Sequence, residues 1–330
     1  MDQERDKVVI VSQKTRLEGL LERFNTREQA KFWIEHMGLD FSDYDREHER
    51  YQAALAQVRR SLDGLLPKIQ VIERGFLPSF VFSPKDLVVT VGRDGLVVNT
   101  AKYLDGHPVV AVNPDPLRWD GLLLPFTAER ALPATRRVLD GKAGFYRITM
   151  AEASLNDGQT MLAFNEFMIG QRGHVSSRYS LSWHGKTEEQ SSSGVLVSTG
   201  AGSTGWLSST QNMAEAVAGL LLPGKAPRFP RMRLGWDDPR LIFVVREPFL
   251  SKGSGVSLGA GVVGPGESIS LESHMPEGGV IFSDGVEADA ITFTSGSVVT
   301  IAAAKRKTML VAAETRVATA PRRRAGEARP

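Results

Sequence analysis

The chain has 330 residues, 42% of them hydrophobic and 24% charged, and carries a formal net charge of +2. These values are typical of a globular protein of about two domains, and the small charge gives no reason to expect a nucleic acid partner. The sequence contains no cysteine, which excludes disulfides, zinc–thiolate sites and thiol nucleophiles. It has no apolar run of about 18 residues and its N-terminus is charged, so we expect a cytoplasmic protein without a membrane partner.

Short apolar runs alternate with helical patterns in the N-terminal part of the chain. Four runs predict buried strands, over 8–11, 69–72, 87–91 and 109–112. Apolar residues at helical spacing predict helices over 45–66, 96–104 and 131–139. A series of this kind builds a mostly parallel sheet covered by helices, so we predict a three-layer α/β domain.

The third apolar run ends in four residues that are suited to binding phosphate. Gly92-Arg93-Asp94-Gly95 follows the strand, and a helical pattern begins at Leu96. Glycines let the backbone approach an anion closely, and the N–H groups at the start of a helix are unpaired. The carboxylate of Asp94 can act as a base between the glycines. An ordinary strand-to-helix turn is the other interpretation.

A basic stretch follows the first predicted strand. It contains Lys14 and Arg16, which come directly after the run over 8–11. Ligands of open α/β sheets bind at the carboxyl ends of the strands, which makes both residues candidate phosphate contacts. Solvated surface residues are an equally good interpretation.

The pattern changes after about residue 140. Strand-like runs follow one another with tight turns, and we expect one helix, over 207–222. The expected strands lie at 145–153, 160–169, 179–183, 194–199, 269–271, 280–282, 291–294, 298–303 and 309–312. We therefore predict an α/β domain over 1–140, a mainly antiparallel β domain over 141–318 whose C-terminal segment can pack back on the first, and a disordered tail over 319–330.

Two adjacent polar residues interrupt an apolar strand of the second domain. Asn165 and Glu166 stand between Phe164 and Phe167, and a buried carboxylate without a partner costs several kcal/mol. Such a pair can bind a nucleoside, because Glu accepts hydrogen bonds from ribose hydroxyls and Asn bonds a ring nitrogen or a hydroxyl. A strand end with its polar side in solvent is the other interpretation.

A loop of small residues precedes the predicted helix of this domain. It runs from Ser198 to Trp206 and contains three glycines and four hydroxyl-bearing residues. Such a loop can donate backbone and hydroxyl hydrogen bonds while the aromatic ring stacks on a base. The loop is therefore a candidate nucleotide-binding segment.

Other motifs in the predicted β domain are weaker indicators of a functional site. The segments 200–205 and 259–264 match G-x-G-x-x-G, but neither lies in a strand–helix–strand unit with the acidic residue that a Rossmann site needs. The segment 255–259 matches a nucleophile elbow without the helix that should follow it. Asp284-Gly285 is typical of an ordinary hairpin turn. The six histidines show no metal-ligand spacing, and we predict no metal site in the chain.

The order of these motifs resembles that of the NAD kinase family. Gly-x-Asp-Gly at 92–95, Asn165-Glu166, the 198–206 loop and Asp284-Gly285 follow one another as the family's motifs do. The chain is more similar to the mitochondrial-type branch, which it resembles at 14–16, 112–116, 192–194 and 246–248. The resemblance covers about residues 8–313. It implies an N-terminal α/β domain like that of NAD and diacylglycerol kinases, followed by a mainly antiparallel β domain.

The resemblance also implies a role for each motif. Asp94 would be the general base that takes the proton from the adenosine-ribose 2′-hydroxyl of NAD, and ATP with Mg²⁺ would supply the phosphoryl group. Phosphates would be bound by Gly92, Arg93, Gly95, Lys14 and Arg16. NAD would be bound by Asn165, Glu166, Ser198, Thr199, Ser203, Thr204, Trp206, Ser209 and Asp284. Family members are usually homo-oligomers, which implies a homodimer or homotetramer.

The sequence departs from the family at several positions, among them Gly200-Ala201, where bacterial members have Pro-Thr, and Trp206, where the family has Tyr. Arg93 stands where the family has its second glycine, Leu96 where a Thr is usual, and Ser193 where many bacterial members have Asp. If that glycine is needed for a positive φ, Arg93 would cost on the order of 1–2 kcal/mol, or its guanidinium could instead bind a phosphate. Two other functions stay open on these grounds. One is a catalytically silent NAD or NADP sensor, and the other is a kinase of a lipid or another hydroxyl substrate.

Overall fold

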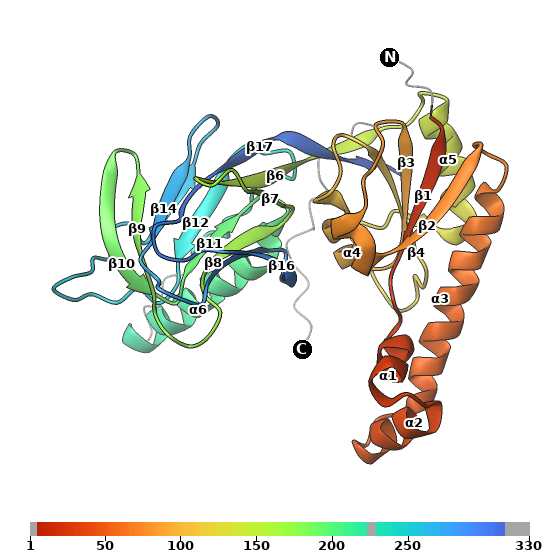
Figure 1. Cartoon of the computed structure of the whole chain (residues 1–330), viewed down its shortest axis with the longest axis horizontal. Coiled ribbons are helices and arrows are strands. Elements are labelled where there is room, and N and C mark those ends of the chain that lie inside the picture. The colour runs from red at the N-terminus through yellow and green to blue at the C-terminus, as the bar shows by residue number, and fades with distance from the viewer. Residues whose placement is uncertain (1–4, 223–228, 314–330) are drawn as a thin grey trace. The chain divides into compact units, whose positions relative to one another are not determined.

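A computed structural model describes residues 5–222 and 229–313 and divides the chain into two compact units (Figure 1). Unit 1 extends to Phe145 and takes in the segment that begins at Thr308. Unit 2 extends from Tyr146 to Lys307. The tail predicted over 319–330 lies outside the described residues.

Unit 1 contains a parallel sheet whose strands are the four predicted ones. They are β1 (Lys7–Ser12), β2 (Lys68–Glu73), β3 (Asp86–Val91) and β4 (Pro108–Asn113), in the order β4-β3-β1-β2. The short β5 (Phe126–Thr127) and the end of β17 (Val298–Val311) also pair with β4 in parallel. Every residue of β3 and β4 is buried, which explains why both strands are mainly apolar.

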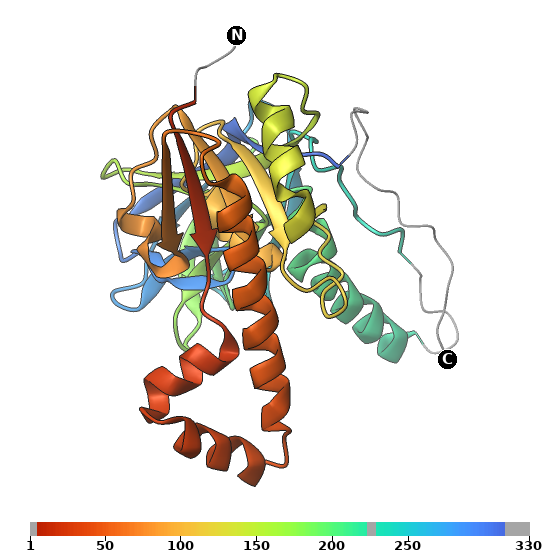
Figure 2. The same cartoon turned by 90° about the vertical axis from the view of Figure 1, so that its right-hand side faces the viewer.

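Helices cover both faces of this sheet. On one face lie α3 (Phe41–Leu62) and α5 (Ala131–Leu139), and on the other lies α4 (Asp94–Ala101) with the 3₁₀ turn η1 (Arg74–Ser79) (Figures 1 and 2). Side chains of α3 and α5 pack with those of the strands into one core. This gives unit 1 the three layers expected from the sequence.

Two helices of unit 1 were not predicted. They are α1 (Arg16–Phe24) and α2 (Arg27–His36), which lie beside the N-terminal half of α3 (Figures 1 and 2). Thr15 and Glu18 form a capping box at the start of α1, and Thr26 caps α2. The helices bury a small cluster of their own with the start of α3, comprising Leu17, Ala30, Ile34 and Phe41.

Unit 2 is a sandwich of two sheets. One has the antiparallel order β13 (Ala260–Val263), β12 (Leu241–Val245), β11 (Val195–Ser198), β8 (Glu166–Gln171), β15 (Gly279–Ser283) and β16 (Val286–Thr292). The other has the order β10 (Lys186–Ser192), β9 (Ser177–Trp183), β14 (Ile269–Ser273) and β17, with β6 (Phe145–Leu155) beside β17 and β7 (Thr160–Ala163) beside β6. The largest core cluster contains residues of both sheets. Helix α6 (Trp206–Leu221) packs on the six-stranded sheet through Leu207.

Some strand predictions in the second half of the chain are wrong in their boundaries, including that over 291–294, where the strand is β16 (Val286–Thr292). The run over 160–169 forms β7 and β8, which belong to different sheets, because the carbonyls of Phe164 and Asn165 between them bind Thr199. The runs over 298–303 and 309–312 form the single strand β17. Strands β10, β12 and β13 were not predicted at all, and β10 is too polar for an apolar-run criterion.

The predicted fold class is confirmed: a parallel α/β unit is combined with a mainly antiparallel β unit. Among the described residues, no helix has the length and apolar character that a membrane crossing requires.

Candidate functional site

The Gly92–Gly95 loop has an ordinary backbone at its unusual residue. Arg93 adopts φ −88° and ψ 170° and is the N-cap of α4, so it needs no left-handed conformation. The strain that a required glycine would have implied is therefore absent. Asp94 is the first residue of α4, and its Oδ1 accepts a hydrogen bond of 2.6 Å from the N–H of Leu123.

The two glycines of this loop have different surroundings. A Cβ on Gly92 would lie 2.7 Å from Leu96 Cδ2 and 2.9 Å from Gln13 Oε1, so only glycine fits there without displacing these side chains. A Cβ on Gly95 would meet nothing within 4 Å. Leu96, which replaces the usual Thr, is fully buried beneath the loop. The loop is thus packed on its inner side and open at Gly95.

Three predicted phosphate-binding cations differ in their partners. Lys14 pairs with Glu22 at 2.7 Å, and this hydrogen bond raises the pKa of Lys14. Arg16 pairs with the carboxylates of Asp43 and Glu47. The guanidinium of Arg93 lies 5.7 Å from the ring centroid of Trp119 and has no carboxylate partner among the described residues. Arg93 is therefore the cation of this group whose charge is not already balanced.

In unit 2, Asp284 holds the segment that contains Asn165 and Glu166. Its carboxylate accepts hydrogen bonds from the N–H groups of Phe164 at 3.0 Å and Asn165 at 2.6 Å, and a longer one from Glu166 at 3.4 Å. Asp284 has φ 57° and Gly285 has φ 67°, which is the hairpin-turn conformation expected from the sequence. One residue thus forms the turn and also fixes the polar pair.

The carboxyl group of Glu166 lies in an environment that favours its neutral form. Burial, and then the charge of Asp284, raise the pKa of Glu166 to about 7. Its Oε2 is buried and has no hydrogen-bond partner in the described part of the chain. The same oxygen lies 3.9 Å from where a Cβ of Gly205 would be, so it faces the start of α6.

This environment predicts a pH dependence of stability. Because the folded-state pKa of about 7 exceeds the ordinary 4.5, the contribution of Glu166 to stability is full below about pH 4.5 and declines as the pH rises to about 7. The loss is expected to be roughly 3 kcal/mol relative to Glu166→Gln, which cannot ionise. Urea unfolding of both proteins across this range measures it. Parallel stability curves for the two proteins would contradict the prediction.

The hydroxyls of the 198–206 loop fall into two groups. The first group is buried and bonds backbone carbonyls: Ser198 binds that of Thr199, Thr199 that of Phe164, and Ser203 that of Gly200. A Cβ on Gly202 would collide with the carbonyl oxygen of Asn165, so the loop packs directly on the Asn165-Glu166 segment. These hydroxyls fix the shape of the loop.

The second group is available to a ligand. Thr204 and Ser209 are exposed, and the ring of Trp206 is partly exposed at the first turn of α6. The Arg246 guanidinium lies 5.3 Å from the centroid of that ring.

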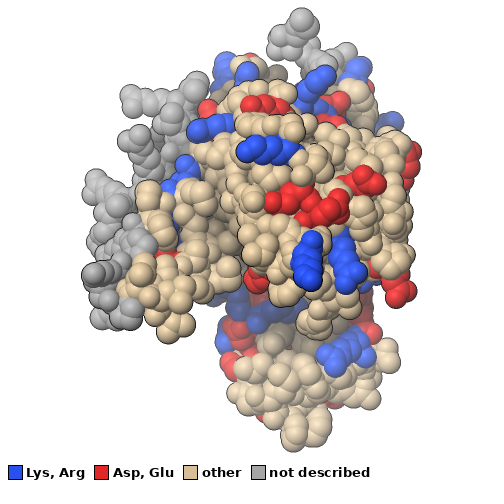
Figure 3. All heavy atoms as spheres, turned by 90° about the vertical axis from the view of Figure 1, so that its left-hand side faces the viewer, with Lys and Arg blue, Asp and Glu red and all other residues tan. Residues whose placement is uncertain are grey.

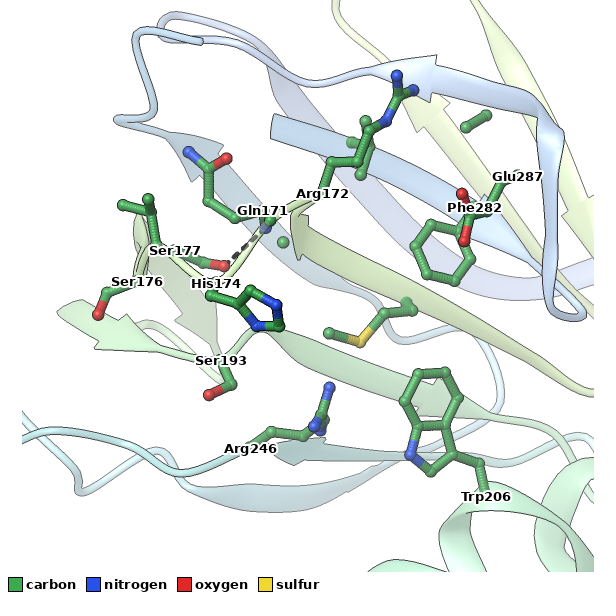
Figure 4. Close-up of a pocket in the computed structure, with 16 residues that line it drawn as sticks. Gln171, Arg172, His174, Ser176, Ser177, Ser193, Trp206, Arg246, Phe282 and Glu287 are labelled. Carbon is green, nitrogen blue, oxygen red and sulfur yellow. Dashed lines mark hydrogen bonds between the residues drawn. The ribbon is translucent and has the colours of Figure 1, made fainter. Parts of the chain in front are cut away.

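A cavity of about 300 Å³ in unit 2 begins at Trp206 (Figure 4). The side chains of Arg246 and His174 point into it, and Trp206 and Phe282 lie at one end. Gly170 lines the cavity, and a Cβ there would lie 2.7 Å from Ser177 Oγ. The cavity therefore combines aromatic surface with cationic groups.

Several lining residues of this cavity were not predicted: Arg172, His174, Arg246, Phe282 and Glu287. Arg246 belongs to the stretch 246–248 that carried part of the resemblance, and Phe282 precedes the Asp-Gly turn. Arg172, His174 and Glu287 stand in no pattern that spacing alone would reveal.

On the face of unit 2 that Figure 3 shows, basic and acidic side chains are interspersed.

Comparison with known proteins finds similar sequences among NAD kinases. No family model matches the chain. It is 24% identical over 318 residues to human "NAD kinase 2, mitochondrial", covering 74% of this chain and 71% of the relative. The rat protein of the same name is 23% identical over 321 residues, covering 74% of each. The NAD kinase of Aromatoleum aromaticum is 32% identical over 130 residues, covering 37% of this chain and 42% of that one.

Two solved structures share the fold. The yeast NADH kinase complexed with NADH has a TM-score of 0.55 at 15% identity, covering 95% of this chain and 85% of that one. An NAD kinase from Archaeoglobus fulgidus in complex with ATP has a TM-score of 0.50 at 16% identity, covering 93% and 94%. The chain is therefore similar to NAD kinases in the order of its motifs, in these sequence relatives and in its fold.

Proposed function

We propose that the protein phosphorylates the 2′-hydroxyl of the adenosine ribose of NAD with a nucleoside triphosphate, ATP, to give NADP. The observation that carries the proposal is the carboxylate of Asp94, which Leu123 orients at the start of α4. Oδ2 of Asp94 has no hydrogen-bond partner among the described residues and is the atom that would take the hydroxyl proton. The freed oxygen forms a bond to the γ-phosphorus, and the bond to the β-phosphate oxygen breaks with release of ADP.

On the donor side, charge and backbone groups support this reaction. Gly95 is open to a ligand, and Arg93 offers a guanidinium without a carboxylate partner. We assign both, with Gly92, to the phosphate groups of ATP. Lys14 and Arg16, which pair with carboxylates, would contribute only if those pairs open.

A magnesium ion fits as a companion of the triphosphate. The described residues include no group of three or more His, Asp or Glu side chains that could hold a metal ion. Mg²⁺ is commonly bound by substrate phosphates with one or two carboxylates, so a dedicated cluster is not needed. When bound, the ion neutralises phosphate charge.

On the NAD side, we assign Asn165 and Glu166 to the adenosine, and the exposed Thr204, Trp206 and Ser209 to the dinucleotide. The cavity beside Trp206 has the aromatic and cationic lining that suits a base and a phosphate. Ser198, Thr199, Ser203 and Asp284 bond the backbone, and we assign them the role of holding these groups in position.

Turnover with defined substrates tests the proposal. Purified protein with NAD, ATP and Mg²⁺ is expected to form NADP, detected by an NADP-specific dehydrogenase. NADH in place of NAD, and polyphosphate in place of ATP, identify the preferred acceptor and donor. Absence of product with every combination would reject the proposal, and tight dinucleotide binding without turnover would indicate a sensor.

The predicted homodimer or homotetramer and the cytoplasmic location stay predictions of the sequence. Two relatives carry "mitochondrial" in their names. Light scattering of the purified protein measures the oligomeric state.

A further inference from the structure

One loop of unit 1 contacts both functional residues of the Gly92–Gly95 loop. This segment, the 114–125 loop, follows β4 and donates the Leu123 N–H to Asp94 at 2.6 Å. Its Trp119 ring lies 5.7 Å from the Arg93 guanidinium. The 114–125 loop therefore determines where the proposed base and the proposed phosphate-binding cation lie.

Asn113, the last residue of β4, hydrogen-bonds two backbone groups of this loop. Its Oδ1 accepts a hydrogen bond from the N–H of Asp115 at 3.1 Å, and its Nδ2 donates to the carbonyl of Trp119 at 2.9 Å. The N–H groups of Arg118 and Trp119 both bond the carbonyl of Asp115. These bonds shape the turn but do not attach it to the rest of unit 1.

Three ion pairs attach the loop to helix α3, and the longest joins Arg118 to Glu47 at 3.8 Å. Arg50 binds the buried carboxylate of Asp115 at 3.0 Å. Asp43 binds Arg118 in a bidentate pair, with 2.8 Å from Nη1 to Oδ1 and 2.5 Å from Nη2 to Oδ2. Planar bidentate pairs of this kind fix orientation as well as distance. The pair between Asp43 and Arg118 therefore holds the residue that precedes Trp119 in the loop.

Asp43 is itself held in place. Arg16 donates to its Oδ2 at 2.7 Å, and Arg16 also pairs with Glu47 one turn further along α3. The Arg118 guanidinium, and then Arg16, hold the pKa of Asp43 well below its usual range, so the residue stays ionised. Networks that share a charge in this way lose less side-chain freedom for each pair than isolated surface pairs do.

We propose that Asp43 is a positioning residue for phosphoryl transfer: through Arg118 it holds the 114–125 loop where Leu123 fixes Asp94 and Trp119 supports Arg93. Asp43 touches no reacting atom in this role. The expected effect on kcat rests on the proposed function. The effect of Asp43 on the order of the 114–125 loop does not, and it can be measured in the protein without substrates.

Hydrogen exchange of the free protein tests that statement. Asp43→Asn is expected to raise amide exchange over residues 118–124 by at least ~10-fold, while peptides from unit 2 exchange as in the wild type. Asp45→Asn is the matched control, because Asp45 lies on the same helix but pairs with Arg27 of α2 at 2.7 Å. Unchanged exchange over 118–124 in Asp43→Asn overturns the proposal.

Kinetics test the consequence for the reaction. Asp43→Asn is expected to lower kcat by about 10-fold and change KM for NAD by less than about twofold, since misplacing a catalytic group affects chemistry more than binding. Asp43→Glu keeps the charge and both oxygens and is expected to recover most of kcat. A normal kcat in Asp43→Asn overturns the proposal. An inactive wild type would reject the proposed function instead, and hydrogen exchange would still decide whether Asp43 holds the loop.

Discussion

Asp94→Asn is expected to lower kcat for NAD phosphorylation by about 10²- to 10⁴-fold, the range for loss of a general base. Asparagine keeps an oxygen that can accept the Leu123 N–H, so the loop is expected to retain its geometry and the substrates their affinity. Single-turnover and steady-state kinetics with saturating ATP measure the effect.

The control for this variant is Asp105→Asn, which removes an exposed carboxylate that follows α4. It is expected to keep wild-type kcat. If Asp94→Asn retained more than about a tenth of the wild-type kcat, Asp94 would not be the base. Thermal unfolding of both variants checks that the folded fraction is the same.

Asp284→Gly is expected to raise KM for NAD by about 10-fold or more and to lower the free energy of unfolding by on the order of 3 kcal/mol. Glycine adopts φ 57° without strain, so the hairpin turn is kept. The substitution removes the carboxylate that binds the N–H groups of Phe164 and Asn165. Those two donors then lack partners, and the Asn165-Glu166 segment is free to shift.

Asp284→Asn separates the loss of charge from the loss of the acceptor. Asparagine also tolerates a positive φ and keeps one amide oxygen that can accept a hydrogen bond. It is expected to lose less stability and less NAD affinity than Asp284→Gly. Isothermal calorimetry with NAD and chemical unfolding give both quantities. Equal behaviour of Asp284→Gly and the wild type would show that the carboxylate does not hold the segment.

The parts of the fold that follow from sequence are those whose side chains face one continuous core. Strands β3 and β4 are buried along their whole length, so their sequences are mainly apolar. Helix α5 has the bounds expected from its periodicity. The helices α1 and α2 bury only a small cluster, and the signal that could have found them is their caps, Thr15 with Glu18 and Thr26.

In the candidate site, too, only some features can be predicted from the sequence. Motif order predicts candidate site residues but not the side chains they contact, because those partners are distant in sequence. The carboxylates that neutralise Arg16 come from α3, and the acceptor that holds Asn165 is Asp284, 119 residues further along the chain. The hydrogen bond from the Thr199 hydroxyl to the carbonyl of Phe164 likewise forms only where β11 pairs with β8 in the folded unit.

The backbone of Arg93 bears on how readily this position can change. At φ −88° and ψ 170° every L-amino acid is accommodated, and the residue is exposed. Position 93 is thus a site where charge and size can be varied while Gly92 and Asp94 keep their conformation. Under the proposed function, substitutions there are expected to change the affinity for the phosphoryl donor without disturbing the backbone of the Gly92–Gly95 loop.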